Sequence, residues 1–168
     1  IRDRSYRVDR VLSLALKFVG IDDKSIEGRN TLKEALEYVG LNPVEVLGKY
    51  PHQLSGGQRQ RILIARCWII KPKLIVADEP VSMVDASLRG SIVMLFDKMR
   101  NDYGTSILFI THDISLAYAI SDRILVMHSG RIVEEGKPDE IVLSPRDSYT
   151  KQLLESIPKL RKKWEDLP

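Results

Sequence analysis

Two short, strongly apolar segments, residues 74–77 and 106–110, limit the possible folds of this chain more than any other feature. Runs of this kind are typical of strands that are covered on both faces of a sheet. Between them, Asp85 is placed to cap a helix whose apolar residues recur at helical spacing from Leu88 to Met99. A strand, a helix and a second strand within about 35 residues predict a βαβ unit, and hence an α/β fold with a mostly parallel sheet flanked by helices.

Residues 1–50, by contrast, are charged and helical in pattern. The apolar residues between Leu32 and Val39 share one helix face, with Thr31 as the expected N-cap and Gly40 at the expected end. An earlier helix is expected from Val11 to Val19. The first part of the chain is therefore predicted to contain helices and no strand.

Beyond the second strand, the pattern favours a helix, a hairpin and two short helices. In chain order these are a helix from the cap Asp113 to about Ile120, strands at 124–127 and 131–133 joined around Ser129-Gly130, a helix opened by Pro138 and a helix from Tyr149 to Ile157. Ser144-Pro145 is expected to separate the last two helices.

The composition of the 168-residue chain narrows the classes to which it can belong. With 26 Lys and Arg against 23 Asp and Glu, the net charge of +3 is too small to argue for nucleic acid or an anionic membrane. The longest apolar runs have five residues, whereas a bilayer-spanning helix needs about 20. The single Cys67 excludes a disulfide within the chain. The chain begins with Ile and shows no secretory leader, so we expect it to start partway through a gene product.

A glycine-rich loop at residues 54–58, ahead of a helical run that reaches Trp68, is the first candidate for chemistry. Gly56 and Gly57 let the backbone approach a ligand, and the N–H groups that open the helix favour an anion. Ser55 adds a hydroxyl donor. Taken by itself, the loop fits an ordinary helix cap equally well.

The acidic pair Asp78-Glu79 ends the first predicted strand. Ligands of open α/β sheets bind beyond the carboxyl ends of the strands, which is where both acids are expected to lie. One carboxylate can hold Mg²⁺ while its neighbour orients or deprotonates a water molecule. Two solvated acids followed by Pro80 are the alternative interpretation.

The segment Thr111-His112-Asp113 ends the second predicted strand. Strand ends of a parallel sheet share one edge, so His112 is expected to face the same crevice as Glu79, where it can hydrogen-bond a phosphate oxygen. The alternative is a helix-capping Asp113 beside an incidental histidine.

In their order and spacing, these features resemble the second half of an ATP-binding-cassette (ABC) ATPase. Residues 54–58 resemble the family's signature motif, which contacts a nucleotide held by a second subunit. The signature residues implied are Ser55, Gly56, Gly57 and Gln58. Residues 82–85 fall where the family has its D-loop, usually Ser-Ala-Leu-Asp. Ser82 and Asp85 are kept and the middle pair is Met83-Val84, which implies a place for Ser82 and Asp85 at the dimer seam.

The ends of the two predicted strands also resemble motifs of that family. Residues 74–79 resemble its Walker B strand, which implies that Asp78 binds Mg²⁺ and that Glu79 is the catalytic base. His112 is similar in position to the family's switch histidine, a second catalytic residue.

The resemblance covers nearly the whole chain and predicts three parts. These are residues 1–70, part of a helical subdomain that ends in the signature motif and its helix; residues 71–135, the second half of the ATPase core; and residues 136–168, a C-terminal helical tail. The tail, with Ser144-Pro145 and Ser156-Ile157-Pro158, is similar to that of oligopeptide and dipeptide importer ATPases, as is Tyr50-Pro51-His52-Gln53. No cysteine follows Cys67, so we expect no iron–sulfur cluster of the kind that some relatives carry in this tail.

This resemblance implies an ATP-binding and ATP-hydrolysing subunit that energises an ABC importer for peptides or related solutes, with ATP and Mg²⁺ as its ligands. The implied partners are a second ABC ATPase subunit, identical or different, transmembrane permease subunits and, indirectly, an extracellular solute-binding protein. No nucleic acid is expected. The implied location is the cytoplasmic face of the cell membrane, and the transported substrate is not encoded in these residues.

A phosphate-binding loop of the form Gly-x-x-x-x-Gly-Lys-Ser/Thr occurs nowhere in residues 1–168. We therefore expect the chain alone to bind ATP weakly and to hydrolyse it negligibly. Two alternatives stay open: a non-catalytic chain that completes a partner's ATP site, and half of a DNA-repair or chromosome-type ABC ATPase. The latter needs heptads before the signature, and Gly20, Gly28 and Gly40 interrupt them. The basic residues at 159–163 form either a solvated tail or a membrane contact.

Overall fold

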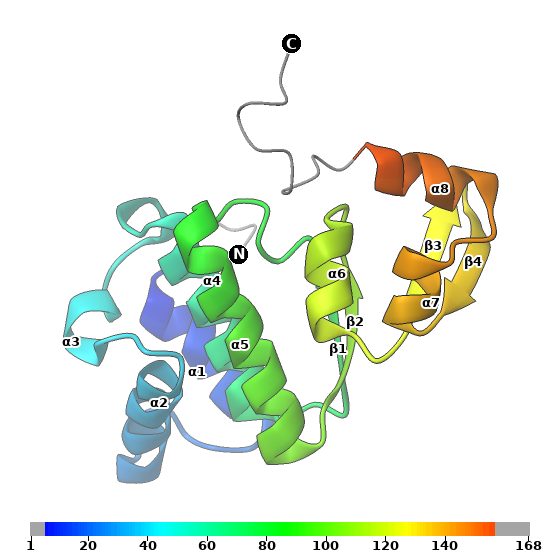
Figure 1. Ribbon diagram of the computed structural model, residues 1–168. Coiled ribbons are helices and arrows are strands. Elements are labelled where there is room, and N and C mark those ends of the chain that lie inside the picture. Colours follow the sequence, from blue (N-terminus) through cyan, green and yellow to red (C-terminus); the bar gives the residue numbers. More distant parts are fainter. Residues whose placement is uncertain (1–5, 157–168) are drawn as a thin grey trace. The chain divides into compact units, whose positions relative to one another are not determined.

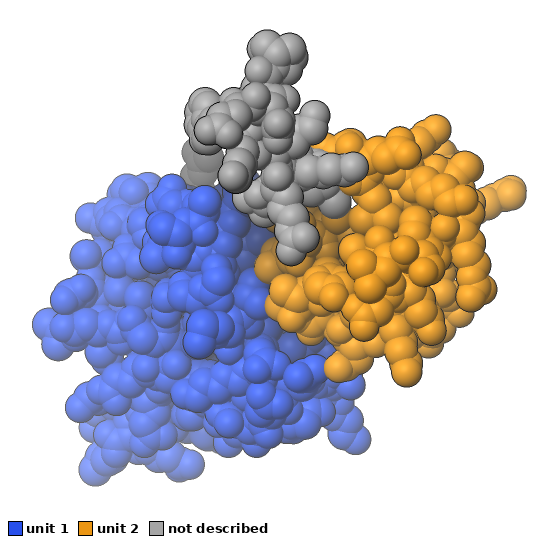
Figure 2. Space-filling view, viewed as in Figure 1, with its two compact units in different colours: residues 1–110 blue, residues 111–168 orange. Residues whose placement is uncertain are grey.

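The computed structural model of the protein describes residues 6–156. The chain forms two compact units, Ile1–Ile110 and Thr111–Pro168, which are coloured separately in Figure 2. This division falls inside the segment 71–135 that the resemblance treats as one part, so the three-part organisation stays a prediction. Among the described residues, none of the helices has both the length and the apolar character needed to cross a membrane.

The first unit begins with a group of helices in which α1 and α2 pack on α4, and the short α3 packs on α2 (Figure 1). They are α1 (Val8–Phe18), α2 (Ile26–Tyr38), α3 (Pro43–Val46) and α4 (Gly56–Ile70), with the 3₁₀ turn η1 (Pro51–Gln53) before α4. Leu12, Leu16, Leu36 and Ile62 are completely buried and form the centre of this group. The prediction that the first part of the chain is helical is therefore confirmed.

The start of α2 differs from the prediction, in which Thr31 was the N-cap. Ser25 caps the helix instead, because its Oγ accepts a hydrogen bond from the Gly28 N–H at 2.9 Å. Thr31 lies inside the helix, where its Oγ1 donates to the Glu27 carbonyl oxygen at 2.9 Å. The prediction was wrong because apolar spacing begins only at Leu32, whereas the cap depends on a local hydrogen bond outside that spacing.

The predicted βαβ unit is confirmed as β1 (Leu74–Asp78), α5 (Ala86–Tyr103) and β2 (Ser106–Ile110). The two strands are parallel, with Leu74 opposite Ser106 and Asp78 opposite Ile110. Helix α5 packs on β2, and the ring of its Phe96 meets that of Phe109 edge-on, with centroids 5.8 Å apart.

The β1–β2 sheet is covered on one face only, which corrects the expectation of cover on both. Ile75 and Ala77 are buried, whereas Val76 is 60% exposed. The exposed apolar side chains of the other face are Leu74, Val76, Leu108 and Ile110. The strands are apolar on both faces, but a two-stranded sheet with one crossover helix can bury only the face beneath that helix.

The second unit contains the predicted hairpin with three helices around it (Figure 1). Its elements are α6 (Ile114–Ile120), β3 (Ile124–His128), β4 (Arg131–Gly136), α7 (Pro138–Leu143) and α8 (Ser148–Glu155). The antiparallel strands turn through Ser129 and Gly130, which both have positive φ (48° and 78°), as a type I′ turn requires. Ile141 lies at the centre of its core. The predicted end of the last helix, Ile157, lies outside the described residues, as does the basic segment 159–163.

Candidate functional site

The N-terminus of α4 carries the glycine-rich loop and is closed by a reciprocal pair of hydrogen bonds. Ser55 Oγ accepts from the Gln58 N–H at 3.2 Å, and Gln58 Oε1 accepts from the Ser55 N–H at 3.0 Å. This capping box fixes both side chains at the helix start. Since Ser55 Oγ acts as an acceptor in it, the hydroxyl hydrogen of Ser55 is still able to donate to a ligand.

The backbone N–H groups at this helix end are arranged to favour an anion. The first N–H groups of an α-helix have no acceptor within the helix. At α4, the Gln58 N–H donates to the Ser55 side chain, and the Arg59 N–H donates to the Ser55 carbonyl oxygen at 3.0 Å. Gly56 and Gly57 carry the N–H groups nearest the helix end, where the helix dipole adds partial positive charge.

The acidic pair lies at the carboxyl end of β1, as predicted from the sequence. Asp78 is the last residue of the strand, and Glu79 follows it, with both residues exposed. Glu79 adopts the left-handed backbone conformation, with φ of 44°, while its N–H donates to the Ile110 carbonyl oxygen of β2 at 2.9 Å. A non-glycine residue rarely adopts this conformation, so the surrounding structure must hold Glu79 in it.

Exposed carboxylate oxygens at a strand end suit Mg²⁺, which usually takes one or two carboxylates together with phosphate oxygens and water. Asp78 and Glu79 supply such oxygens on neighbouring residues. Residues 6–156 contain no group of three or more His, Cys, Asp or Glu side chains that could hold a metal by themselves. The donor set therefore fits a metal shared with a phosphate ligand.

The turn that follows Glu79 leads into α5. The Ser82 N–H and Oγ both donate to the Glu79 carbonyl oxygen, at 3.2 and 3.0 Å. Asp85 stands at the N-cap position of α5, but its side chain makes no cap hydrogen bond. The predicted side-chain cap is therefore wrong: the Leu88 N–H donates to the backbone carbonyl of Asp85 at 2.8 Å.

His112 follows β2 by two residues and is exposed. Its neighbour Asp113 caps α6, as predicted, because Asp113 Oδ1 accepts from the Leu116 N–H at 3.1 Å. The Asp113 N–H also donates to Thr111 Oγ1 at 3.0 Å. Because His112 belongs to the second compact unit and Glu79 to the first, their sharing of one crevice stays a prediction.

A cavity of about 540 Å³ lies in the first unit beside Tyr38 and Arg61 and was not predicted from the sequence. The Tyr38 hydroxyl donates to Asp102 at 3.1 Å, and Lys98 Nζ lies 4.1 Å from the centre of the Tyr38 ring. Burial, followed by the bond to Asp102, raises the pKa of Tyr38 well above its usual value. The Arg61 guanidinium donates to the Val39 carbonyl and to Ser91 Oγ. These contacts tie α2, α4 and α5 together, and no periodic pattern marks them.

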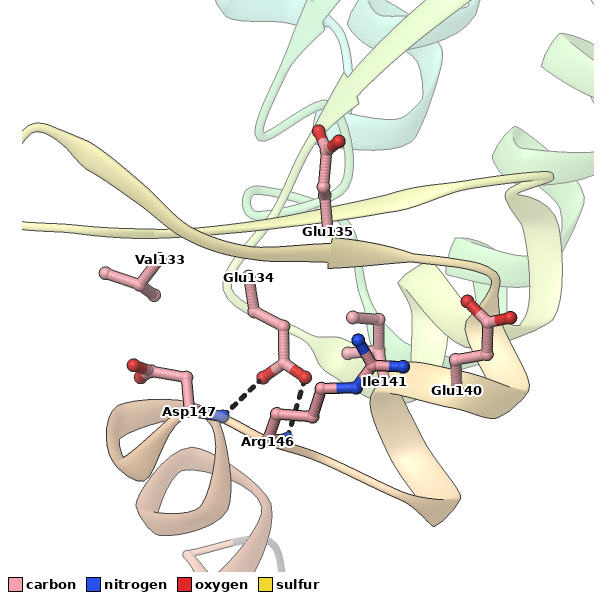
Figure 3. Close-up of a pocket in the computed structure, with 7 residues that line it drawn as sticks. All are labelled: Val133, Glu134, Glu135, Glu140, Ile141, Arg146 and Asp147. Carbon is pink, nitrogen blue, oxygen red and sulfur yellow. Dashed lines mark hydrogen bonds between the residues drawn. The ribbon is translucent and has the colours of Figure 1, made fainter.

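A second cavity, of about 260 Å³, lies beside Glu134 in the second unit (Figure 3). Glu134 accepts hydrogen bonds from the backbone N–H groups of Arg146 at 2.8 Å and Asp147 at 3.1 Å. Burial acts to raise the pKa of Glu134, but the Thr150 side chain and these two N–H groups outweigh it, so the pKa lies below its usual value. Figure 3 shows Glu134 directed at this backbone, whereas Glu135 projects from the other face of β4. Glu134 therefore fastens the segment before α8 to the hairpin.

Comparison with known protein families adds an independent observation. Residues 5–82 match the family model described as "ABC transporter". Among curated proteins, the chain is 48% identical to the oligopeptide transport ATP-binding protein OppF of Streptococcus mutans, over 127 residues. It is 46% identical to OppF of Bacillus subtilis over 132 residues, and 43% identical to the dipeptide transport ATP-binding protein DppF of Lactococcus lactis over 152 residues.

These matches cover most of this chain and less of the relatives. They include 76%, 79% and 90% of the chain, respectively. The corresponding shares of the relatives are 41%, 43% and 48%. The chain therefore spans less than half the length of each of these relatives.

Proposed function

The chain belongs to the ABC transporter family of ATP-binding proteins, and from that premise we propose that it forms the nucleotide-covering and hydrolytic part of an ATPase subunit that energises peptide import. Membership of this family implies ATP binding. The observation that carries the proposal is the presence, in one compact unit, of an anion-favouring helix end at Gly56 and of the exposed acids Asp78 and Glu79 at a strand end. Peptides are proposed as the solute because the relatives are named for oligopeptide and dipeptide transport.

In the proposed mechanism, the start of α4 covers the γ-phosphate of an ATP molecule that a second subunit holds. Ser55 donates its hydroxyl hydrogen, and Gly56 and Gly57 donate their N–H groups, to phosphate oxygens. Gln58 keeps Ser55 in position through the capping box. These groups are fixed before the ligand arrives, so they stabilise the charge of the phosphoryl group without reorganisation.

The strand end supplies the hydrolytic groups of the same proposal. Asp78 would hold Mg²⁺, which would neutralise phosphate charge when bound. Glu79 accepts a proton from, or orients, the attacking water, and its backbone hydrogen bond to Ile110 fixes where its side chain starts. For His112 we propose a hydrogen bond to a γ-phosphate oxygen of the bound ATP.

The remaining roles follow from assembly of two such subunits. Ser82 and Asp85 lie at the seam of the dimer, where each subunit's signature loop faces the other's nucleotide. Closure on ATP and opening after hydrolysis drive transmembrane permease subunits between two states. This assembly acts at the cytoplasmic face of the membrane, supplied with solute by an extracellular binding protein.

The exposed face of the β1–β2 sheet supports a further part of the proposal. Parallel sheets are normally covered on both faces, and here Val76 and Leu108 are 60% and 47% exposed. We infer that the active domain covers this face with polypeptide that also supplies the phosphate-binding loop. The 168-residue chain alone therefore binds Mg-ATP weakly and hydrolyses it negligibly, and tight binding by the isolated chain would contradict this.

The hydrolytic role of Glu79 is tested by the substitution Glu79→Gln in the protein that carries this chain together with a phosphate-binding loop. We expect ATP turnover to fall by about 100-fold or more, because a general base contributes on that order, while ATP binding is kept. The variant should accumulate as an ATP-bound dimer, measured by size-exclusion chromatography with and without ATP.

Glu135→Gln is the matched control, since this exposed carboxylate pairs with Arg123 at 2.8 Å in the hairpin and has no proposed catalytic role. Its turnover should stay within about twofold of the parent protein, as expected for an exposed pair. Near-parental turnover by Glu79→Gln would refute the assigned role. Nucleotide-dependent dimerisation without any turnover in the parent protein would instead favour a non-catalytic chain that completes a partner's site.

A further inference from the structure

We propose that Gly56 holds the turn from Glu79 to Val84 in place, so that the turn carrying Glu79 and the N-terminus of α4 move as one piece. Gly56 and Ser82 are then positioning residues for Glu79. The inference rests on the proposed function of Glu79 and extends it. It gives Gly56 a task within its own subunit that requires no bound nucleotide.

The turn is built around the strained backbone of Glu79. Its φ of 44° is unfavourable for a residue with a side chain, and its N–H bond to the Ile110 carbonyl oxygen, at 2.9 Å, ties its backbone to the sheet. On the other side, its carbonyl oxygen accepts from both the N–H and the Oγ of Ser82. Ser82 therefore closes the turn that holds Glu79 in this conformation.

The rest of the turn is fixed by its backbone and by two buried valines. Val81 and Val84 are 6% and 4% exposed, and the Val84 N–H donates to the Val81 carbonyl oxygen at 3.2 Å. Met83, between them, has a side chain that is 85% exposed. The position of Met83 is therefore set by its main chain, and its side chain contributes little.

The Met83 carbonyl lies directly against Gly56. A Cβ atom added to Gly56 would lie 2.1 Å from the Met83 carbonyl oxygen and 3.3 Å from its carbon, whereas real Cβ contacts essentially never fall below 3.0 Å. A Cβ atom at Gly57 would lie 3.4 Å from Leu88 Cδ1 and 3.9 Å from Val84 Cγ1, which are ordinary contacts. Of the two neighbouring glycines, only Gly56 is required by packing against the turn.

This difference predicts opposite results for two otherwise matched substitutions. In Gly56→Ala, the new methyl group must displace the Met83 carbonyl, a backbone group that cannot rotate away like a flexible side chain. The displacement reaches Ser82 and Glu79 through the hydrogen bonds of the turn. In Gly57→Ala, the methyl group fits beside Leu88 and Val84, so the turn keeps its conformation.

The first test is amide hydrogen exchange at Glu79 and Ser82 in the 168-residue chain, measured by NMR without nucleotide. We expect Gly56→Ala to raise the exchange rates of both amides by about tenfold or more, and Gly57→Ala to leave them within about twofold of the parent chain. Equal rates in the two variants would overturn the proposal. Because no ATP is present, this result does not depend on whether Glu79 is a catalytic residue.

Ser82 provides a second test that keeps both glycines and decides the matter if Gly56→Ala fails to fold. Ser82→Ala should raise the exchange rate of the Glu79 amide, and in the ATP-hydrolysing protein it should lower kcat by about tenfold with KM for ATP unchanged. Ser82→Thr, which keeps the hydroxyl, should restore kcat. Parental exchange and kcat in Ser82→Ala would overturn the proposal. Parental turnover in Glu79→Gln would instead refute the proposed function and leave the exchange results intact.

Discussion

The helices and the two-stranded sheet of the first unit bury their apolar residues to very different degrees. Leu16 and Leu36 of the helical group are completely buried, while Val76 and Leu108 on one face of the sheet are about half exposed or more. Both regions are rich in apolar residues, so composition does not explain the difference. Other helices of the chain bury the apolar side chains of the helical group, whereas only one face of the sheet is buried.

The apolar residues of a strand therefore reflect its burial in the complete domain, including burial by elements that lie outside its own chain segment. An amphipathic helix needs one buried stripe, which neighbouring helices in sequence can cover. A parallel strand needs cover on two faces, which requires elements from several parts of a domain.

The largest expected effect separates a buried leucine from an exposed valine. Leu36→Ala should lower the free energy of unfolding by about 2–5 kcal/mol, since it removes a fully buried side chain and leaves a cavity. Val76→Ala should change it by less than about 0.5 kcal/mol, as for an exposed position. Urea unfolding followed by circular dichroism measures both values. A loss of more than 2 kcal/mol in Val76→Ala would mean that this sheet face is covered in the isolated chain.

The second prediction compares the N-caps of a helix in each region. Ser25→Ala should lower the free energy of unfolding by about 1 kcal/mol, because it removes the acceptor of the Gly28 N–H at the start of α2. Asp85→Ala, at the start of α5, should cost less than about 0.5 kcal/mol, because its side chain makes no cap hydrogen bond. The same unfolding experiment measures both, and equal losses would contradict the assignment of the two caps.

The smallest effect extends the comparison to the hairpin of the second unit, which a polar contact fastens to the segment before α8. Because the pKa of Glu134 lies below its usual value of 4.5, its stabilising contribution is fully present above that pH. It is lost as pH falls through the lowered pKa. We expect a loss below about 1 kcal/mol, seen as faster amide exchange at Arg146 and Asp147 in acid.

Glu134→Gln should remove this pH dependence, while Glu135→Gln, whose carboxylate pairs with Arg123 at 2.8 Å, should keep it. Exchange at Arg146 and Asp147 that responds to acid equally in both variants would exclude Glu134 as the titrating group.

Much of the fold follows from the sequence because its signals are local. The hairpin through Ser129-Gly130 and the Asp113 cap are set by residues within a few positions of one another, and each element of the βαβ unit is marked by its own apolar spacing. All three are confirmed. The Ser25 cap and the exposed sheet face were mispredicted. Apolar spacing predicts which residues tend to be buried. It does not predict which hydroxyl caps a helix, or whether another element covers the second face of a sheet.

In the candidate site, too, local features could be predicted from the sequence and long-range contacts could not. Its residues could be singled out from motif and spacing, and the structure places Asp78 and Glu79 at the strand end where they were expected. The contact between Gly56 and the Met83 carbonyl could not be predicted, because it joins a helix start to a turn more than 25 residues later without any side-chain pattern. The role of Glu134 could not be predicted from any periodic pattern either, because its hydrogen-bond partners are backbone N–H groups.

The connections of the two sheets set the order in which they can form. The β3–β4 hairpin closes through a two-residue turn, so it needs no other element and can form within about 1–10 µs. The β1–β2 pair joins strands separated by α5 and must first bring distant chain segments together, which costs loop entropy. Before β1 and β2 pair, the backbone N–H and C=O groups of both apolar strands can pair with other chains. Folding of the first unit is therefore the slower step and the one most exposed to aggregation.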